Sequence, residues 1–300
     1  MSRQAQSSEA IRHITLKIEM MMSPDILDVT VVIPVKNEES SIGECLAHLK
    51  RFASIVVIDS GSTDRTVEIA TAAGAKVLQF EWNGGYPKKR NWFLINHSPA
   101  TTWVLFLDAD ELVNDKFCNE LMRQTAESIY VGFWLNYRIN FLGRGLRYGL
   151  CQKKLALLRV GSGLYERIHE ENWSTLDMEV HEHPILDGAV GELLQPIRHH
   201  DFKTISMFVQ RHNEYARWEA MRATHLERMT FEESGRLTRR QRIKYRYIAK
   251  WWYPWFYFAY TYFIRLGLLD GAAGFYYAFF KLSYFLTVRL SIKEIKSALR

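Results

Sequence analysis

Residues 103–111 read Trp-Val-Leu-Phe-Leu-Asp-Ala-Asp-Glu, so that five apolar residues run directly into a set of acids. An unbroken apolar run of this length is typical of a strand that is buried on both faces of a parallel sheet. Ligands of such sheets bind beyond the carboxyl ends of the strands. We therefore expect Asp108 and Asp110 at the ligand-binding edge, where carboxylate oxygens suit Mg²⁺ or Mn²⁺. The alternative for an isolated Asp-x-Asp is a solvated turn.

The residues before this run alternate between strand-like and helix-like patterns. Short β-branched or apolar runs predict strands, and apolar residues at helical spacing predict helices between them. The predicted strands are 29–35, 55–58, 76–80 and 103–107, and the predicted helices are 40–52, 62–74 and 87–96. This alternation predicts an α/β fold with a mostly parallel sheet flanked by helices. Two later strand patterns, 131–141 and 155–160, have no helix between them and predict an antiparallel extension.

Charged and aromatic residues divide the chain into two parts. Residues 236–290 carry ten Lys and Arg against one acid, a net charge of +9, while the other 245 residues sum to −3. Of the 41 aromatic residues, 17 lie within 251–290. A helical pattern over 201–226 leads toward this segment. We therefore expect a basic aromatic helical tail attached to the α/β domain.

Polar turns follow the other predicted strands at the same edge of the sheet. The second strand ends in Asp59 and continues as Ser-Gly-Ser-Thr-Asp at 60–64, where small residues let the backbone approach a ligand. Asp59 can accept hydrogen bonds from a base or a ribose. The alternative is a helix cap from Ser62 or Thr63, with Asp64 stabilising the helix dipole. We expect both, with Asp59 on the ligand and Asp64 in a structural role.

The first predicted strand likewise ends in a polar turn, Pro-Val-Lys-Asn-Glu at 34–38. Acidic residues therefore follow three of the predicted strands. The sequence contains neither GxxxxGK[ST] nor GxGxxG, the glycine-rich patterns that cradle phosphates. This disfavours a P-loop enzyme and a Rossmann dinucleotide enzyme.

Three motifs together resemble those of family 2 glycosyltransferases, which have the GT-A fold. They are Val-Ile-Pro-Val-Lys-Asn-Glu-Glu at 32–39, Ile-Asp-Ser-Gly-Ser-Thr-Asp at 58–64 and Phe-Leu-Asp-Ala-Asp-Glu at 106–111. Because the motifs occur in this order and at these intervals, the resemblance is specific.

The resemblance continues downstream and covers roughly residues 28–290. Val-His-Glu at 180–182 and the glycines at 267, 271 and 274 are similar to those of bacterial lipopolysaccharide-core β-glucosyltransferases. The sequence departs from that pattern at His200 and Asp201, which replace a more usual Tyr-Ser, and in its unusually aromatic tail.

The resemblance implies transfer of a hexose from a nucleotide-diphosphate sugar, expected to be a UDP-sugar, with inversion at the anomeric carbon. It implies that Asp110 ligates Mg²⁺ or Mn²⁺ on the diphosphate, and that Asp108 contacts the ribose or the same cation. Such a cation offsets the negative charge that builds on the departing nucleotide. The other residues implied to bind the donor are Pro34, Val35, Glu38, Asp59, Lys89, Arg90 and Ala109. For Lys89 and Arg90 a basic surface helix is the alternative.

Inversion by direct displacement needs a base on the acceptor side, and Glu182 is the candidate. The alternative for Glu182 and its neighbouring histidines is a polar strand end. A zinc site that includes His199 and His200 is disfavoured, because scattered histidines lack the spacing of zinc ligands. His199 is expected to orient the base or the diphosphate.

The tail has 251–264 as its longest uncharged stretch, which at fourteen residues is shorter than the roughly 20 that a spanning helix needs. We therefore expect amphipathic helices at a membrane interface, where Trp and Tyr favour the headgroup level and cations attract anionic lipid. A core-packing helix pair or an oligomer contact is the alternative. Nucleic-acid binding is disfavoured because the aromatic residues are contiguous rather than spaced on a sheet.

Three regions are expected: a flexible extension at 1–27, a GT-A domain at 28–228 and the tail at 229–300, which attaches to the membrane interface. Sparse cysteines without a CxxC pair and a first 28 residues without a leader-like apolar run favour the cytosol. The predicted protein is a peripheral or monotopic enzyme at the cytoplasmic face of the inner (plasma) membrane, acting on a lipid-linked or lipopolysaccharide acceptor. A nucleotidyltransferase and a non-catalytic nucleotide-binding membrane scaffold are the alternatives.

Overall fold

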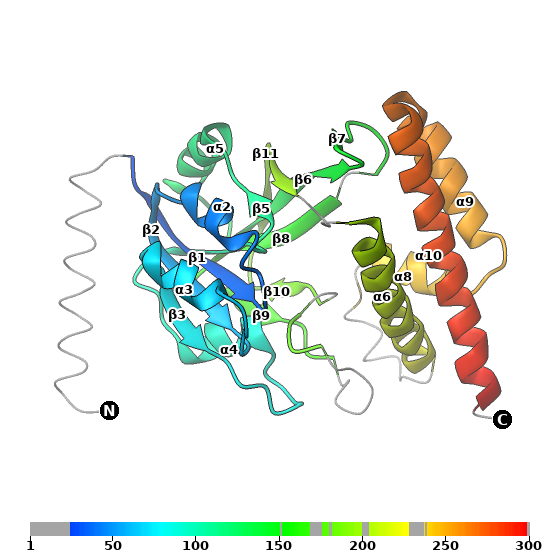
Figure 1. Cartoon of the computed structure of the whole chain (residues 1–300), viewed down its shortest axis with the longest axis horizontal. Coiled ribbons are helices and arrows are strands. Elements are labelled where there is room, and N and C mark those ends of the chain that lie inside the picture. Colours follow the sequence, from blue (N-terminus) through cyan, green and yellow to red (C-terminus); the bar gives the residue numbers. More distant parts are fainter. Residues whose placement is uncertain are drawn as a thin grey trace. The chain divides into compact units, whose positions relative to one another are not determined.

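The computed structural model describes residues 25–150, 152–168, 176–179, 182–199, 204–227, 237 and 239–298. The chain forms two compact units (Figure 1). Unit 1 contains the described residues up to Tyr137 and those from Gln152 to His199, and unit 2 contains the rest. The expected division between 228 and 229 lies outside the described residues and stays a prediction. The helices α6 and α10, on either side of it in the sequence, pack against each other in unit 2.

Unit 1 is built on a sheet with the strand order β3-β2-β1-β4-β8-β6-β11-β5. Pairs β1–β2, β1–β4 and β2–β3 are parallel, whereas β4–β8, β6–β8 and β5–β11 are antiparallel. The bounds are β1 Leu27–Val35, β2 Phe52–Asp59, β3 Lys76–Gln79, β4 Trp103–Phe106, β5 Glu111–Leu112, β6 Gly132–Phe141, β8 Gln152–Arg159, β9 Gly163–Tyr165, β10 Pro184–Leu186 and β11 Val190–His199. The predicted fold class, a parallel sheet with flanking helices and an antiparallel extension, is confirmed.

The register of the parallel strands brings their carboxyl ends together. Val35 at the end of β1 pairs with Asp59 at the end of β2, and Val32 pairs with Phe106 at the end of β4. The side chains in the middle of these strands, such as Val31 and Leu105, have no exposed surface. Their burial between the two faces explains the unbroken apolar runs of the sequence.

The helices of unit 1 are α2 Ile42–Ala47, α3 Thr66–Ala72, α4 Lys89–Asn96 and α5 Asp115–Thr125. Ser62 and Thr63, the residues predicted to cap this helix, lie before the start of α3. The Ser62 hydroxyl donates to Asp59, and the Thr63 amide donates to Asn37. Helix α5 was not expected from the sequence, although Asn114 caps it by accepting from the Phe117 amide.

Unit 2 consists of helices, a short strand and the end of β6 from Arg138 onward. The elements are β7 Arg144–Gly145, α6 Ile205–Leu226, α8 Arg239–Tyr247, α9 Tyr253–Ala259, the π-helix η1 Tyr260–Ile264, the 3₁₀ helix η2 Gly267–Asp270 and α10 Gly271–Ala298. Helix α10 packs along α6, and Phe141 at the end of β6 makes edge contacts with Phe208 and Tyr277 of these two helices. None of the described helices is long and apolar enough to cross a membrane.

Three glycines of the tail allow the chain to reverse tightly between η1 and α10. A Cβ atom on Gly267 would lie 2.9 Å from the Thr261 carbonyl oxygen, and one on Gly274 would lie 2.0 Å from the Gly267 carbonyl oxygen. Gly271 has a φ of +65°, which side chains rarely adopt. The glycine pattern of the sequence therefore has a packing cause inside unit 2.

We predict that Gly274→Ala destabilises unit 2. Alanine gains about 1 kcal/mol of helix propensity, but the forced shift of backbone costs up to about 3 kcal/mol, so the net loss is about 2 kcal/mol. Urea unfolding of the full chain measures it, with Ser283→Ala on the exposed side of α10 as the control. An unchanged unfolding midpoint for Gly274→Ala would show that the close approach is absent.

Candidate functional site

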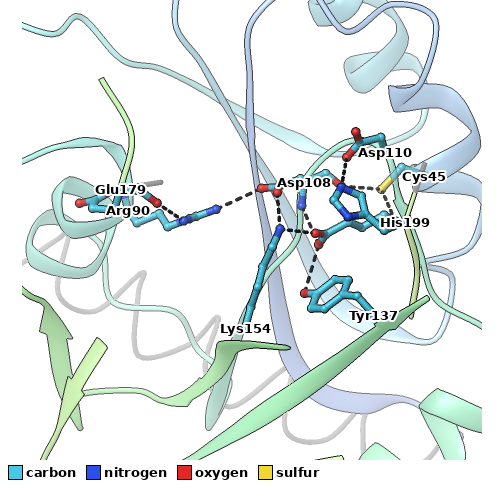
Figure 2. A network of polar contacts seen from close by, with 9 residues as sticks. Cys45, Arg90, Asp108, Asp110, Tyr137, Lys154, Glu179 and His199 are labelled. Atoms are coloured by element: carbon cyan, nitrogen blue, oxygen red, sulfur yellow. Dashed lines mark hydrogen bonds and ion pairs between the residues drawn. The ribbon is translucent and has the colours of Figure 1, made fainter. Parts of the chain in front are cut away.

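Acidic residues after β4 lie together with a histidine from β11 (Figure 2). One ligand atom from each of Asp108, Asp110 and His199 lies within 4.8 Å of the other two. The pairing of β11 with β5 causes this, because it places His199 opposite Glu111 in antiparallel register. Residues about ninety positions apart in the sequence therefore form one cluster, which we call the acidic cluster: Asp108, Asp110, Glu111 and His199.

Both carboxylate oxygens of Asp108 contact cations of the protein. Lys154 Nζ lies 2.6 Å from Oδ2, and Arg90 Nη2 lies 3.0 Å from Oδ1. Burial by itself would raise the pKa of Asp108, but these two cations outweigh burial and hold it well below its usual range. Asp108 is therefore ionised and already partnered.

Glu111 is the most buried acid of the cluster, at 1% exposure. Its carboxylate accepts from Lys154 Nζ at 2.5 Å, from the Tyr137 hydroxyl at 3.3 Å and from the Asp108 amide at 3.1 Å. Burial raises the pKa of Glu111, and the charge of Lys154 opposes that rise. Neither Lys154 nor Tyr137 was expected at the site from the sequence, because both lie on strands far from the three motifs.

His199 faces Asp110, with Nε2 3.6 Å from Oδ1. Burial disfavours the protonated ring, but the contact with Asp110 and the charge of Glu111 outweigh it and raise the pKa of His199 to about 9. Two carboxylates and one imidazole form a donor set that can hold a divalent cation, and ligation by His199 requires loss of its proton. The residues present fit the expected Mg²⁺ or Mn²⁺. His200 lies outside the described residues.

Asp59, at the end of β2, organises the turn that follows it. Its carboxylate accepts from the amides of Gly61 and Ser62, each at 3.1 Å, and from the Ser62 hydroxyl at 2.5 Å. The side chain is 1% exposed. Asp64 accepts from Thr66 and so has the structural role that the sequence suggested. The donor contact expected for Asp59 stays a prediction.

The remaining predicted donor residues of β1 and β4 offer mainly backbone atoms. Val35 and Ala109 have buried side chains, as does Pro34. The Val35 carbonyl accepts from the Ser60 amide at 3.2 Å and from Lys89 Nζ at 3.4 Å. The Glu38 carboxylate accepts from the Ser41 hydroxyl. The turn after β1 is thus tied to the turn after β2.

The first residues of α4 are buried, which excludes the alternative of a basic surface helix for Lys89 and Arg90. Lys89 is 3% exposed and Arg90 is 9% exposed. The Glu179 carboxylate accepts from the Arg90 and Asn91 amides at 2.8 and 2.9 Å, and so caps the helix. Lys89 Nζ lies 3.2 Å from Asp177, which in turn accepts from the Ser60 hydroxyl at 2.6 Å.

These contacts connect the turn after Asp59 with Asp108 at the end of the next predicted acidic motif. The turn after Asp59 reaches Asp177 through Ser60, and Asp177 reaches Lys89. The next residue, Arg90, reaches Asp108 with its guanidinium (Figure 2). Four of the predicted donor residues, Asp59, Lys89, Arg90 and Asp108, therefore belong to one network at the carboxyl edge of the sheet.

Glu182 lines a small pocket that also belongs to unit 1. Its carboxylate lies 2.8 Å from Lys88 Nζ, and both side chains are almost fully buried. The pocket lining also includes Trp82, Tyr86 and Glu166. Val180 and His181, the other residues of this motif, lie outside the described residues.

Residues 30–175 match the family model described as Glycosyl transferase family 2. This segment belongs to glycosyltransferase family 2. The resemblance that the three motifs indicated is therefore confirmed. The family 2 segment contains Asp59, Asp108 and Asp110, whereas Glu182 and His199 lie beyond it.

Over 173 residues the chain is 31% identical to the lipopolysaccharide core biosynthesis glycosyltransferase LpsC of Rhizobium meliloti. The alignment covers 55% of this chain and 60% of LpsC, so the chain spans less than two thirds of that relative.

Two solved structures are also similar. A structure of S. aureus TarS has 16% identity and a TM-score of 0.46, covering 89% of this chain and 92% of TarS. Glucosyl-3-phosphoglycerate synthase from Mycobacterium tuberculosis, in complex with Mn²⁺, UDP and glucosyl-3-phosphoglycerate, has 24% identity and a TM-score of 0.30, covering 37% and 43%. At these TM-scores neither structure bears on the activity of this chain.

We predict that Glu179→Ala lowers the free energy of unfolding by about 1–3 kcal/mol, because two buried amides lose their acceptor. Chemical unfolding measures this. Glu68→Ala, which removes an exposed carboxylate that pairs with the exposed Arg65, serves as the control and should change little. Equal stability of the two variants would contradict the capping role of Glu179.

Proposed function

We propose that the protein is an inverting glycosyltransferase that moves a hexose from a nucleotide-diphosphate sugar, a UDP-sugar, to a hydroxyl of a lipid-linked or lipopolysaccharide acceptor. The observation that carries the proposal is the convergence of Asp108, Asp110 and His199 at the carboxyl edge of a family 2 domain. The similarity to LpsC supports a lipopolysaccharide or cell-surface glycan as the acceptor.

In this proposal Asp110 and His199 hold Mg²⁺ or Mn²⁺, with Asp108 beside them. When bound, the cation offsets the charge of the departing nucleoside diphosphate. Arg90 and Lys154 add positive charge at the same place and orient Asp108. Asp59 holds the turn after β2 in place by accepting from the Gly61 and Ser62 amides, and this turn contacts the base and ribose of the donor in our proposal.

Glu182 takes the proton of the acceptor hydroxyl as the new glycosidic bond forms. Two observations support this role: the carboxylate lines a pocket of unit 1, and Lys88 holds it in one position. Trp82 and Tyr86 give the pocket apolar surface of the kind that packs against a sugar ring.

We predict that Asp110→Ala abolishes transfer and that Glu182→Gln lowers kcat by about 10²–10⁴-fold, the range of a lost general base. Assays use UDP-sugars with Mn²⁺ or Mg²⁺, chosen by a thermal-shift screen of nucleotide-sugars. Glu192→Gln, a surface carboxylate paired with Lys153, is the matched control. Near-normal turnover by Glu182→Gln would remove that residue from the base role.

The products separate the proposal from its alternatives. A nucleotidyltransferase releases pyrophosphate, whereas a glycosyltransferase releases a nucleoside diphosphate. A non-catalytic scaffold binds the nucleotide and releases neither product.

We further propose that unit 2 attaches the enzyme to the surface of an anionic bilayer. Large apolar side chains are exposed on α9, η1 and η2, among them Trp255 at 56%, Phe263 at 55% and Ile264 at 70%. Exposed cations, including Lys250 and Arg265, lie on the same stretch of chain. Aromatic residues next to cations suit the headgroup region of anionic lipids.

We predict that the double variant Trp255→Ser/Phe263→Ser loses most of its binding to liposomes that contain phosphatidylglycerol. Point changes are preferable to deletion, because α10 packs against α6. Ile129→Ser/Leu194→Ser, which removes two exposed apolar residues of unit 1, is the control and should bind normally. Flotation on a density gradient measures binding, and equal flotation of both variants would refute the membrane proposal.

A further inference from the structure

We propose that the Lys154 ammonium suppresses binding of a divalent cation to the donor-free acidic cluster, so that the cation enters together with the diphosphate of the donor. This inference rests on the proposed function and concerns the order of events at the same site. It assigns a role to a residue that lies outside the three sequence motifs.

Lys154 stands where a divalent cation would compete with it. Its Nζ contacts Asp108 Oδ2 at 2.6 Å and Glu111 Oε1 at 2.5 Å, and Arg90 takes Asp108 Oδ1. A cation that approaches Asp108 therefore has to displace one of two protein cations. Asp110 and His199 are the remaining ligands of the described cluster.

Lys154 is partly exposed, and its strand and its contacts hold it in this position. Residues of β8 pair with β4 on one side and with β6 on the other, and Lys154 itself lies opposite Leu135 of β6. Its Nζ lies 5.0 Å from the centre of the Tyr137 ring. Glu111, at 1% exposure, depends on Lys154 as its counter-ion. Removing the ammonium from Glu111 would leave a buried carboxylate without its charge partner, which is costly.

The charges of the cluster explain why binding of the cation is coupled to binding of the donor. Without donor, Lys154 and Arg90 offset two of the three carboxylates of Asp108, Asp110 and Glu111, and His199 faces the third, Asp110. A divalent cation added to this arrangement is repelled by both protein cations, and partial burial strengthens that repulsion. The diphosphate of a donor adds negative charge and further oxygen ligands. The cation and the diphosphate therefore bind more tightly together than either does alone, and the coupling is reciprocal.

A purely structural role of Lys154 makes a different prediction. If Lys154 only neutralised Glu111, its loss would loosen the cluster and weaken cation binding with and without nucleotide. If Lys154 opposes the cation, its loss tightens cation binding in the donor-free protein. The two roles thus predict changes of opposite sign.

The experiment is titration of Mn²⁺ into the full chain by calorimetry, with and without UDP. We expect UDP to tighten Mn²⁺ binding to the wild type by at least about 30-fold, within the usual range of coupling between sites. We expect Lys154→Gln to tighten donor-free Mn²⁺ binding by about tenfold or more, because one nearby positive charge is lost. The effect of UDP on Mn²⁺ affinity should fall correspondingly in Lys154→Gln.

Two control variants complete the test. Lys153→Gln removes the adjacent lysine, which pairs with Glu192 at the surface, and should behave as wild type. Lys154→Arg keeps the charge and should retain weak donor-free binding. Donor-free Mn²⁺ affinity that is unchanged or weaker in Lys154→Gln overturns the inference.

The wild type decides the question if Lys154→Gln does not fold. Equal Mn²⁺ affinity with and without UDP would then overturn the inference.

Failure of the proposed function is distinguishable, because in that case no nucleoside diphosphate or nucleotide-sugar binds with either cation. The donor-free comparison between wild type and Lys154→Gln would still decide the role of the lysine.

Discussion

The site depends on the compensation of three carboxylates that follow a single strand. Asp108, Asp110 and Glu111 lie within four residues of one another, and Glu111 is almost fully buried. Like charges at this spacing repel, and burial penalises each of them. Lys154 and Arg90 outweigh these costs for Asp108, and Lys154 offsets part of them for Glu111, because their side chains reach the carboxylates from β8 and from α4. The acidic edge of the sheet is therefore stable only in the context of cations supplied by distant elements.

A second constraint holds the turns around this edge in place. Glu179 caps α4, and this cap orients the guanidinium of Arg90 toward Asp108. Asp177, two residues earlier, connects Lys89 to the turn after β2. One short segment, 176–179, therefore links the helix that carries two cations to the turn that Asp59 organises. A change in this segment is expected to affect both ends of the site.

Much of the fold and part of the site were predictable from particular residues. The apolar runs that end in Asp59 and Asp108 predicted the parallel strands and the edge where their ends meet, and the structure has both. Helix α5 was missed, because its polar residues mask a short apolar face, although Asn114 before Asp115 was a usable cap signal. Lys154 could not be identified, since a lysine at the start of a strand carries no sign of its partners.

The sequence by itself determined the alternation of elements, the acids at the ends of strands and the basic, aromatic composition of the tail. These are local properties, because the pattern of apolar residues within a short stretch of chain predicts buried strands and helices. Only the tertiary structure decided that His199 joins Asp110, that Lys154 compensates Asp108 and Glu111, and that Lys88 holds Glu182. The first two of these pairings follow from the register of antiparallel strands, and the third brings together residues 94 positions apart. Electrostatic contacts depend on distance in space, which the order of residues alone does not specify.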